Sequence, residues 1–232
     1  MKSLHFYFTC FKNFFTFSIF AHVYQLPQYI TAGFEEVFAF MQAHPFILLT
    51  CNGKNGYPHA THVPVLMEIK EEKLFLACHV MKNTDHANAI MANRDILCIF
   101  SGANSYVSAS WYDKKNVGST WNYKAVHALG SIRIYDEVEL LEHLTKLTRK
   151  YETGHSGESL VENMDKNYVD KMMQAIMGIE IEINTISHVF KLSQEKSEKE
   201  FEHIQQHLFE KGNESAQVAK DMEEIKQHLF KK

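Results

Sequence analysis

The sequence predicts an α+β fold dominated by β structure: a compact antiparallel barrel with peripheral helices and a helical C-terminal tail. Segments with the residue pattern of strands recur about every ten residues and are joined by short turns. A strong hairpin signal, Asn52-Gly53-Lys54-Asn55-Gly56, separates the first two of them. With 232 residues, 45% of them hydrophobic, the chain can bury one sizeable core with an appended helical piece.

Residues 31–85 are expected to form one helix, three strands and the start of a second helix. Thr31 is the expected N-cap of the first helix, which ends before Pro45. Its apolar face consists of Phe34, Val37, Phe38 and Met41. Strands are then predicted over residues 46–51, 59–69 and 73–80, and Thr84 or Asp85 caps the next helix.

The stretch 101–130 holds both tryptophans of the chain and a run of hydroxyl and amide side chains. Its residues 106–112 alternate as in a strand, and a second strand opens at Thr120. Large flat side chains interleaved with small polar ones can form a wall for a planar polar ligand. The alternative is a barrel core in which Trp111 and Trp121 simply pack, and the residues alone leave both interpretations open.

The second half of the chain is expected to continue with strands and helices. Residues 96–100 and 127–135 are predicted as strands, and Asp136 with Glu139 forms the capping box of a helix. A shorter helix is predicted around residues 168–177.

Gly178 is expected to end that shorter helix, and residues 179–183 alternate as a strand with one solvated face. The tail from Glu195 is predicted to be helical and split at Gly212-Asn213, with solvated charges over an apolar packing stripe. That stripe consists of Phe201, Ile204, Leu208, Phe209, Val218, Met222, Ile225 and Leu229.

Charge and cysteine content exclude some classes of protein. A net charge of -4 and a pI near 6.4 give no electrostatic footprint of a nucleic-acid binder, and there is no helix-turn-helix signature or basic stripe. The four cysteines are widely spaced with no C-x-x-C pair, which argues against a zinc cluster or a disulfide framework. We therefore expect a protein of the reducing cytoplasm.

Three kinds of chemical site can be weighed from the residues. His62, His79 and His127 fall in predicted strands without paired ligand spacing, so a hydrogen-bonding wall or satisfied core histidines are favoured over a metal site. Ser108 and Ser110 lack a G-x-S-x-G elbow, which disfavours a hydrolase.

Phosphate binding has one candidate segment, because there is no Walker loop and no G-x-G-x-x-G. The segment 79–85 brings Lys82 and Thr84 to a strand end and a helix start, where a terminal phosphate could bind. An ordinary lysine before a capped helix is the alternative.

Several sequence blocks then occur in a fixed order. They are Ala60-Thr61-His62-Val63-Pro64, His79-Val80, Ser110-Trp111-Tyr112, Thr120-Trp121-Asn122-Tyr123, Val126-His127 and Phe190-Lys191-Leu192-Ser193-Gln194. Together they closely resemble the PaiB family of FMN-binding negative transcriptional regulators. The resemblance covers nearly the whole chain after residue 22.

The resemblance implies a split β-barrel similar to those of pyridoxamine-phosphate oxidases and flavin reductases. It implies a cytoplasmic homodimer that holds FMN at the subunit interface and acts as a repressor of transcription, by a route that could be indirect. The rival interpretation is an FMN-dependent oxidoreductase acting on a small planar substrate. A third interpretation, a pocket that holds haem or nothing, also stays open.

The resemblance also assigns site residues by position. Thr61, His62 and Val63 would run beside the flavin ring, with His79 near them, and Lys82 with Thr84 would face the phosphate. The expected pocket wall consists of Ser110, Trp111, Trp121, Asn122, Tyr123 and His127. Many relatives have Asn-Pro in place of Thr84-Asp85, so the Asp85 carboxylate would repel a phosphate unless it serves only as a helix cap.

The first 22 residues are expected to be an upstream extension, followed by a barrel domain over 23–194 and a tail over 195–232. Family members begin Met-Tyr-x-x-Pro, and Val23-Tyr24-Gln25-Leu26-Pro27 stands in that place. A signal peptide is the alternative, because residues 4–21 are apolar and follow Lys2. A membrane-spanning helix is disfavoured, because Lys12 and Asn13 interrupt a stretch that is already short for a bilayer.

Overall fold

The computed structural model describes residues 26–155 and 159–230, so the predicted extension 1–22 lies outside the described residues. The chain forms two compact units. Unit 1 contains the described parts of Pro45–Ile99 and Ala128–Ile186. Unit 2 contains the described parts of Ile19–His44, Phe100–His127 and Ser187–Lys232.

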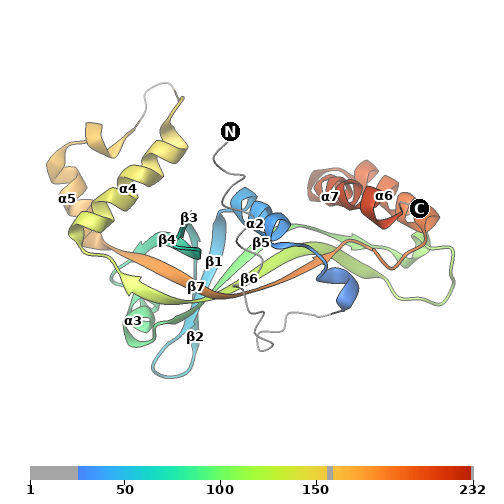
Figure 1. The fold of residues 1–232 in the computed structure, drawn as a ribbon, viewed down its shortest axis with the longest axis horizontal. Coiled ribbons are helices and arrows are strands. Elements are labelled where there is room, and N and C mark those ends of the chain that lie inside the picture. Colours follow the sequence, from blue (N-terminus) through green and yellow to red (C-terminus); the bar gives the residue numbers. More distant parts are fainter. Residues whose placement is uncertain (1–25, 156–158, 231–232) are drawn as a thin grey trace. The chain divides into compact units, whose positions relative to one another are not determined.

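Seven strands form one sheet in the order β2-β1-β5-β6-β7-β4-β3 (Figure 1). Their bounds are β1 Phe46–Asn52, β2 Pro58–Pro64, β3 Leu66–Lys70, β4 Lys73–Met81, β5 Asp95–Val107, β6 Thr120–Ile134 and β7 Ile176–Lys191. The pairs β1–β2, β1–β5, β3–β4 and β4–β7 are antiparallel. Along the chain, β5, β6 and β7 each continue from one unit into the other.

The sheet of unit 1 curls into an open half-barrel because one predicted strand is broken in two. The expected strand over 59–69 is in fact two strands, β2 and β3, separated by Val65. These two strands occupy opposite edges of the sheet, although only one residue separates them in the chain. The sheet must therefore curl to bring its two edges close together. Val65 is buried, and its N–H donates to the Pro45 carbonyl at 2.8 Å instead of continuing the ladder. The predicted split-barrel class is thereby confirmed.

Alternate residues of β4 and β7 fill the barrel of unit 1. Leu76 lies opposite Ile181, and Cys78 lies opposite Ile179, all fully buried. The expected solvated face on β7 is only partly present, because the Glu182 side chain is 39% exposed whereas Glu180 on the same face is only 9% exposed.

The prediction that Gly178 ends a helix is wrong, because Gly178 lies within the strand β7. A Cβ at this position would lie 2.8 Å from Tyr135 Cδ2 and 3.0 Å from Leu140 Cδ1. The glycine therefore serves a close approach of neighbouring side chains to the strand. The preceding helix consequently ends earlier than predicted, at Ala175.

Three α-helices belong to unit 1: α3 Asp85–Ala92, α4 Glu137–Glu152 and α5 Lys166–Ala175. Thr84 is the N-cap of α3, since its Oγ1 accepts from Ala87 N–H at 3.1 Å. The predicted capping box of Asp136 and Glu139 is present at the start of α4. A 3₁₀ turn, η4 Val161–Asn163, lies between α4 and α5.

Unit 2 contains α2 Phe34–Ala43, α6 Glu198–Lys211 and α7 Asn213–Leu229, with the short turns η2 Pro27–Tyr29 and η3 Ala109–Trp111. The helix α2 starts later than predicted, with Gly33 and not Thr31 as its N-cap. The helices α6 and α7 lie side by side and meet at Gly212, as predicted, where φ is +73° (Figure 1). None of the helices in the described part of the chain is long and apolar enough to cross a bilayer.

The predicted packing stripe of the tail is largely confirmed. Phe201, Ile204, Leu208, Val218 and Met222 are buried together in one apolar cluster. Phe209 and Leu229 are exceptions, because they are 62% and 38% exposed.

The aromatic stretch of unit 2 differs from the prediction in two respects. The strand expected over 106–112 stops at Val107, where β5 ends. The Ser108 side chain then accepts from Ser110 N–H at 3.2 Å and starts the turn η3. Downstream, the two strands expected from Thr120 and over 127–135 are a single strand, β6.

Candidate functional site

The predicted flavin residues of unit 1 begin on β2. Thr61 Oγ1 lies 2.7 Å from Nδ1 of His86, a residue in the first turn of α3. His86 is buried and its Nε2 has no hydrogen-bond partner; burial, reinforced by His59, lowers its pKa. His62 is exposed with its ring near Phe46, at 5.8 Å between centroids. Val63 is buried, so its side chain belongs to the core.

The position of β2 gives it a second property. It pairs with β1 on one side, with His62 opposite Leu48, and it is an edge strand in the sheet order. An edge strand presents backbone N–H and C=O groups that no ladder uses. Such alternating donors and acceptors suit the polar rim of a planar heterocycle.

His79 lies near the end of β4 and Lys82 follows the last residue of that strand. The His79 side chain turns toward α4 and that of Lys82 toward α5. His79 Nδ1 lies 3.2 Å from Nε2 of His143 on α4. Burial lowers the pKa of His79. Burial, His79 and Lys146 together lower the pKa of His143 to about 4, so the pair is neutral at pH 7. Lys82 is exposed, and its Nζ donates to the Met173 carbonyl of α5 at 3.4 Å.

Thr84 and Asp85 have separate roles at the start of α3. The Thr84 hydroxyl is already occupied, since it caps the helix and donates to the Met81 carbonyl at 2.9 Å. Asp85 lines an open cavity of about 530 Å³ together with Lys54 of the β1–β2 hairpin. Lys82 lines a different cavity of about 360 Å³, beside α5. The Asp85 carboxylate, which would repel a phosphate, therefore lines a different cavity from the one that Lys82 lines.

The predicted residues of unit 2 divide between η3 and β6. Ser110 and Trp111 lie in η3, and the Trp111 ring stacks on His207 of α6 at 4.8 Å. Trp121 is 52% exposed on β6, with its ring edge-on to Tyr106 at 5.8 Å.

The remaining β6 residues alternate between two faces of the strand. Tyr123 and His127 share a face with Trp121, and burial lowers the pKa of His127. Asn122 faces the other way and is fully buried, where its amide exchanges hydrogen bonds with the Ser193 hydroxyl at 2.9 and 3.1 Å. The Asn122 side chain is therefore committed to the interior of unit 2.

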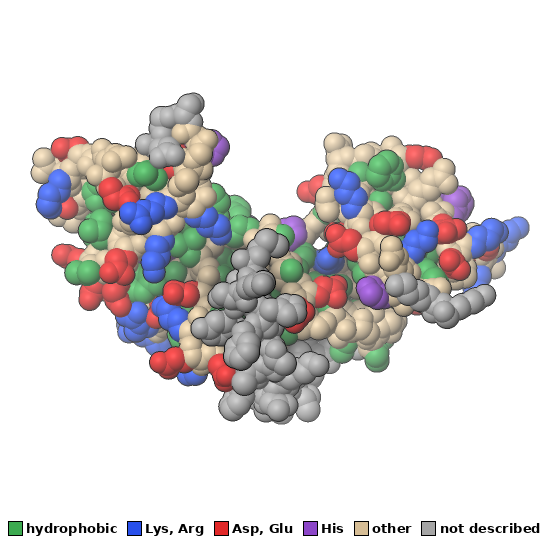
Figure 2. Space-filling view, turned by 45° about the horizontal axis from the view of Figure 1, so that its top comes forward, with side chains coloured by type: hydrophobic (Ala, Val, Ile, Leu, Met, Phe, Trp, Pro, Cys, Tyr) green, Lys and Arg blue, Asp and Glu red, His purple; other side chains and the backbone are tan. Residues whose placement is uncertain are grey.

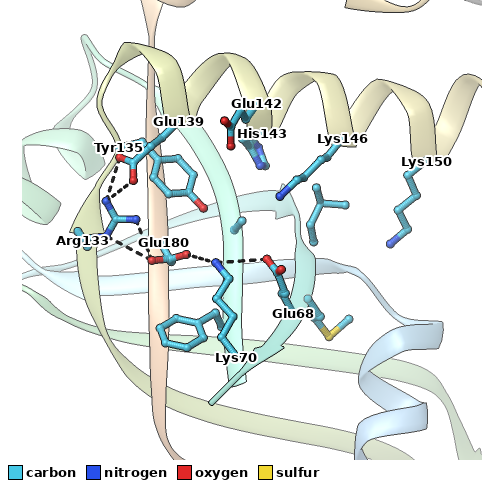
Figure 3. Close-up of a pocket in the computed structure, with 14 residues that line it drawn as sticks. Glu68, Lys70, Arg133, Tyr135, Glu139, Glu142, His143, Lys146, Lys150 and Glu180 are labelled. Atoms are coloured by element: carbon cyan, nitrogen blue, oxygen red, sulfur yellow. Dashed lines mark hydrogen bonds and ion pairs between the residues drawn. The ribbon is translucent and has the colours of Figure 1, made fainter. Parts of the chain in front are cut away.

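Sequence reasoning missed a cavity of about 470 Å³ between β3, β4 and α4 of unit 1 (Figure 3). One wall is a network of ion pairs in which Glu180 accepts hydrogen bonds from Lys70 at 3.0 Å and from Arg133 at 2.9 Å. Arg133 continues to Glu139 at 2.7 Å, and Lys70 to Glu68 at 3.2 Å. These residues are far apart in the sequence, and only Glu139 belongs to a recognisable motif, so no local pattern could have predicted the cavity.

Comparison with known proteins then identifies the family. The family described as "Putative FMN-binding domain" matches residues 23–185. The protease synthase and sporulation protein PAI 2 of Bacillus subtilis is 30% identical over 192 residues, which cover 82% of this chain and 92% of that protein. The chain belongs to this FMN-binding family. An uncharacterised protein of Emericella nidulans is 27% identical over 64% of this chain and 75% of its own length.

Solved structures share the fold at low sequence identity. The flavocytochrome Anf3 from Azotobacter vinelandii has a TM-score of 0.57 and 20% identity, covering 75% of this chain and 74% of that one. The FAD and haem binding protein from Mycobacterium smegmatis has a TM-score of 0.52 and 14% identity, covering 68% and 71%. The predicted resemblance to the PaiB type is confirmed, and the cofactor of the family is FMN.

Proposed function

We propose that FMN lies along the free edge of β2 in unit 1, with its phosphate directed to Lys82 and the start of α3. The observation that carries this proposal is the donor set of unit 1. The β2 edge supplies backbone groups for the flavin rim, the first turn of α3 supplies amides without intrahelical acceptors, and Lys82 supplies a cation. A phosphate of charge roughly -1.5 to -2 favours both a cation and a helix N-terminus.

The other unit 1 residues would tune this site without adding charge. Thr61 is held by His86, so the β2 backbone beside it is fixed. His79 would serve as a neutral hydrogen-bonding group, since burial lowers its pKa and His143 orients its ring. FMN supplies electron-transfer chemistry when bound, and the protein positions it and tunes its surroundings.

The exposed and partly buried unit 2 residues are proposed to close the pocket in a homodimer. Ser110, Trp111, Trp121, Tyr123 and His127 would form that wall, with Asn122 supporting it from the interior. Trp121 is half exposed on its strand, which is consistent with a surface that another molecule covers. Light scattering coupled to size exclusion should give twice the 26.9 kDa chain mass, and a monomer at micromolar concentration would contradict the homodimer.

As a biological role we propose negative regulation of transcription in the cytoplasm, through flavin-dependent sensing and not through direct reading of DNA. The B. subtilis relative is named for protease synthesis and sporulation. The helices α6 and α7 carry eight carboxylates and only four lysines. Figure 2 shows acidic and basic side chains interspersed, whereas a DNA-binding face is strongly basic. Cys51, Cys78 and Cys98 are buried and free, consistent with a reducing compartment.

The flavin site is tested by titrating FMN and riboflavin into the purified protein and following flavin fluorescence. Lys82→Met should weaken FMN binding about tenfold, equivalent to about 1.4 kcal/mol, and leave riboflavin binding unchanged, because riboflavin lacks the phosphate. Lys220→Met, which removes an exposed lysine of α7, is the matched control and should bind FMN like the wild type. Wild-type protein that takes up no FMN would refute the proposal, and equal losses for both flavins would place Lys82 away from the phosphate.

The regulatory role is tested separately by gel shift at physiological salt with and without FMN. We expect no retardation of promoter fragments by the protein alone. Specific retardation would refute the indirect route. Bleaching of the flavin by NAD(P)H, with turnover by a defined acceptor, would favour the oxidoreductase alternative.

A further inference from the structure

Two histidines of α6 form a pair that the flavin site does not use. His203 and His207 are separated by one helical turn, so their side chains lie on the same helix face. Their Nε2 atoms are 3.1 Å apart, with the ring centroids 4.6 Å apart. His203 is exposed and His207 is half exposed, so both rings are accessible from solvent.

The separation of these two nitrogens matches the bite of a metal chelate. Imidazole nitrogens bind zinc at about 2.0–2.1 Å, so two of them at tetrahedral or right angles lie about 2.9–3.4 Å apart. The observed 3.1 Å falls within that range. The same i, i+4 spacing of histidines on one helix face holds the metal in zinc proteases.

The His203 ring is also oriented through its other nitrogen, as metal-bound histidines are. His203 Nδ1 lies 2.9 Å from the Trp111 carbonyl, to which it can only donate, so the neutral His203 ring has its lone pair on Nε2. His207 Nδ1 lies 3.9 Å from Oε2 of Glu210, which is too long for a hydrogen bond. Gln206 donates to the other carboxylate oxygen, Oε1, at 2.9 Å. The Trp111 ring stacks on the His207 ring and restricts its rotation.

Without a metal, the same geometry is a hydrogen bond from His207 Nε2–H to His203 Nε2. A metal ion replaces the shared proton, and the neutral His207 ring then carries its proton on Nδ1, toward Glu210. Both nitrogens facing the gap are then lone-pair donors. Binding must compete with protons in acid, so the affinity should fall as the pH is lowered.

We propose that His203 and His207 chelate a divalent late transition-metal ion, with water completing the coordination. Imidazole ligands suit Cu²⁺, Ni²⁺ and Zn²⁺, with Cu²⁺ bound most tightly, and they do not suit Mg²⁺ or Ca²⁺. Within the described residues no cluster of three or more His, Cys, Asp or Glu groups could hold a metal. The site is therefore an open two-ligand site, whose free positions can accept a further ligand.

Trp111 provides a direct optical probe of this site. Its ring lies 4.8 Å from that of His207, and Trp121 is the only other tryptophan of the chain. In a Trp121→Phe background, CuCl₂ should quench the remaining tryptophan fluorescence with a stoichiometry of one. His203→Ala and His207→Ala should each weaken Cu²⁺ binding at least about tenfold, and MgCl₂ should have no effect.

His228→Ala is the matched control, because it removes an exposed histidine from the neighbouring helix of the same unit. This variant should bind Cu²⁺ like its parent, and far-UV circular dichroism should show equal helix content in all variants. Electron paramagnetic resonance of the Cu²⁺ complex should show two equatorial imidazole nitrogens in the parent and one in each single variant. Unchanged affinity in either single variant, or an equal loss in His228→Ala, would overturn the proposal.

Discussion

The two units bury acidic side chains in different electrostatic surroundings. In unit 1, burial alone would raise the pKa of Glu180, but hydrogen bonds from Lys70 and Arg133 outweigh it and the pKa is lowered. In unit 2, burial raises the pKa of Asp221, and the attraction of Lys124 at 4.0 Å only partly offsets it. The number and closeness of the cations therefore decide the direction of the shift.

The cations of the two clusters also differ in exposure. The side chains of Lys70 and Arg133 are about half exposed, so water can solvate either one if its ion pair with Glu180 is broken. Lys124 is only 7% exposed and lies over the ring of Phe190 at 4.7 Å and that of Phe40 at 5.3 Å. Unit 1 thus has redundant pairing, whereas unit 2 depends on one buried pair.

Removing Lys124, the cation of the buried pair in unit 2, should have the largest effect. Lys124→Met would leave Asp221 buried without its cation, and we expect a loss of about 3–5 kcal/mol in the free energy of unfolding at pH 7. Part of that loss should return on acidification, because below its raised pKa Asp221 is neutral. Urea denaturation at pH 7 and pH 5 measures both quantities.

The control for Lys124→Met is Lys220→Met, an exposed lysine on the same helix as Asp221. It should change stability by no more than about 0.5 kcal/mol. A loss below about 1 kcal/mol for Lys124→Met would mean that the buried pair contributes little and that the two units do not differ in this respect.

Much of the fold was predictable because its signals are local. The hairpin after Asn52, the capping box at Asp136 and the helix break at Gly212 each depend on neighbouring residues, and all three are present. The errors arise where distant contacts decide the structure. The break at Val65 depends on the Pro45 carbonyl, and Gly178 belongs to a strand because Tyr135 approaches it.

The site was predictable to a smaller extent for the same reason. The strand end with Lys82 and the cap at Thr84 can be read from adjacent residues. The partner of His79, in contrast, is His143, 64 positions away. The pair His203 and His207 does carry a local signal, its four-residue spacing on a helix, whereas the histidines considered as ligands from the sequence lie in strands.

The second prediction concerns the loss of stability in acid that buried histidines cause in the two units. Burial lowers the pKa of His188 in unit 2 to about 4, whereas an unfolded histidine titrates near about 6.5. Because the unfolded chain takes up the proton first, stability is full above about pH 6.5 and falls toward pH 4, by up to about 3 kcal/mol. His188→Leu should remove about 2–3 kcal/mol of that acid loss, measured by urea denaturation across this range.

His228→Leu, at an exposed position, should leave the acid loss as in the wild type. His143 in unit 1 sharpens the comparison, because Lys146 contributes to its low pKa and no cation contributes to that of His188. Lys146→Met should therefore raise the pKa of His143 alone, as followed by NMR titration of the ring protons. An equal shift at both histidines would contradict the assigned causes.

The smallest loss of stability is expected from removing one of the two cations that pair with Glu180 in unit 1. Arg133→Met removes the bonds to Glu180 and Glu139, but Lys70 still donates to Glu180 at 3.0 Å. We expect a loss of about 1 kcal/mol at pH 7, since one charged hydrogen-bond partner remains and the removed side chain is half exposed. The pKa of Glu180 should rise toward that of an unfolded glutamate, so the variant should lose less of its stability on acidification than the wild type, as measured by urea denaturation. If Arg133→Met cost as much as Lys124→Met, redundancy would not explain the difference between the two units, and the desolvation of each cluster as a whole would have to account for it.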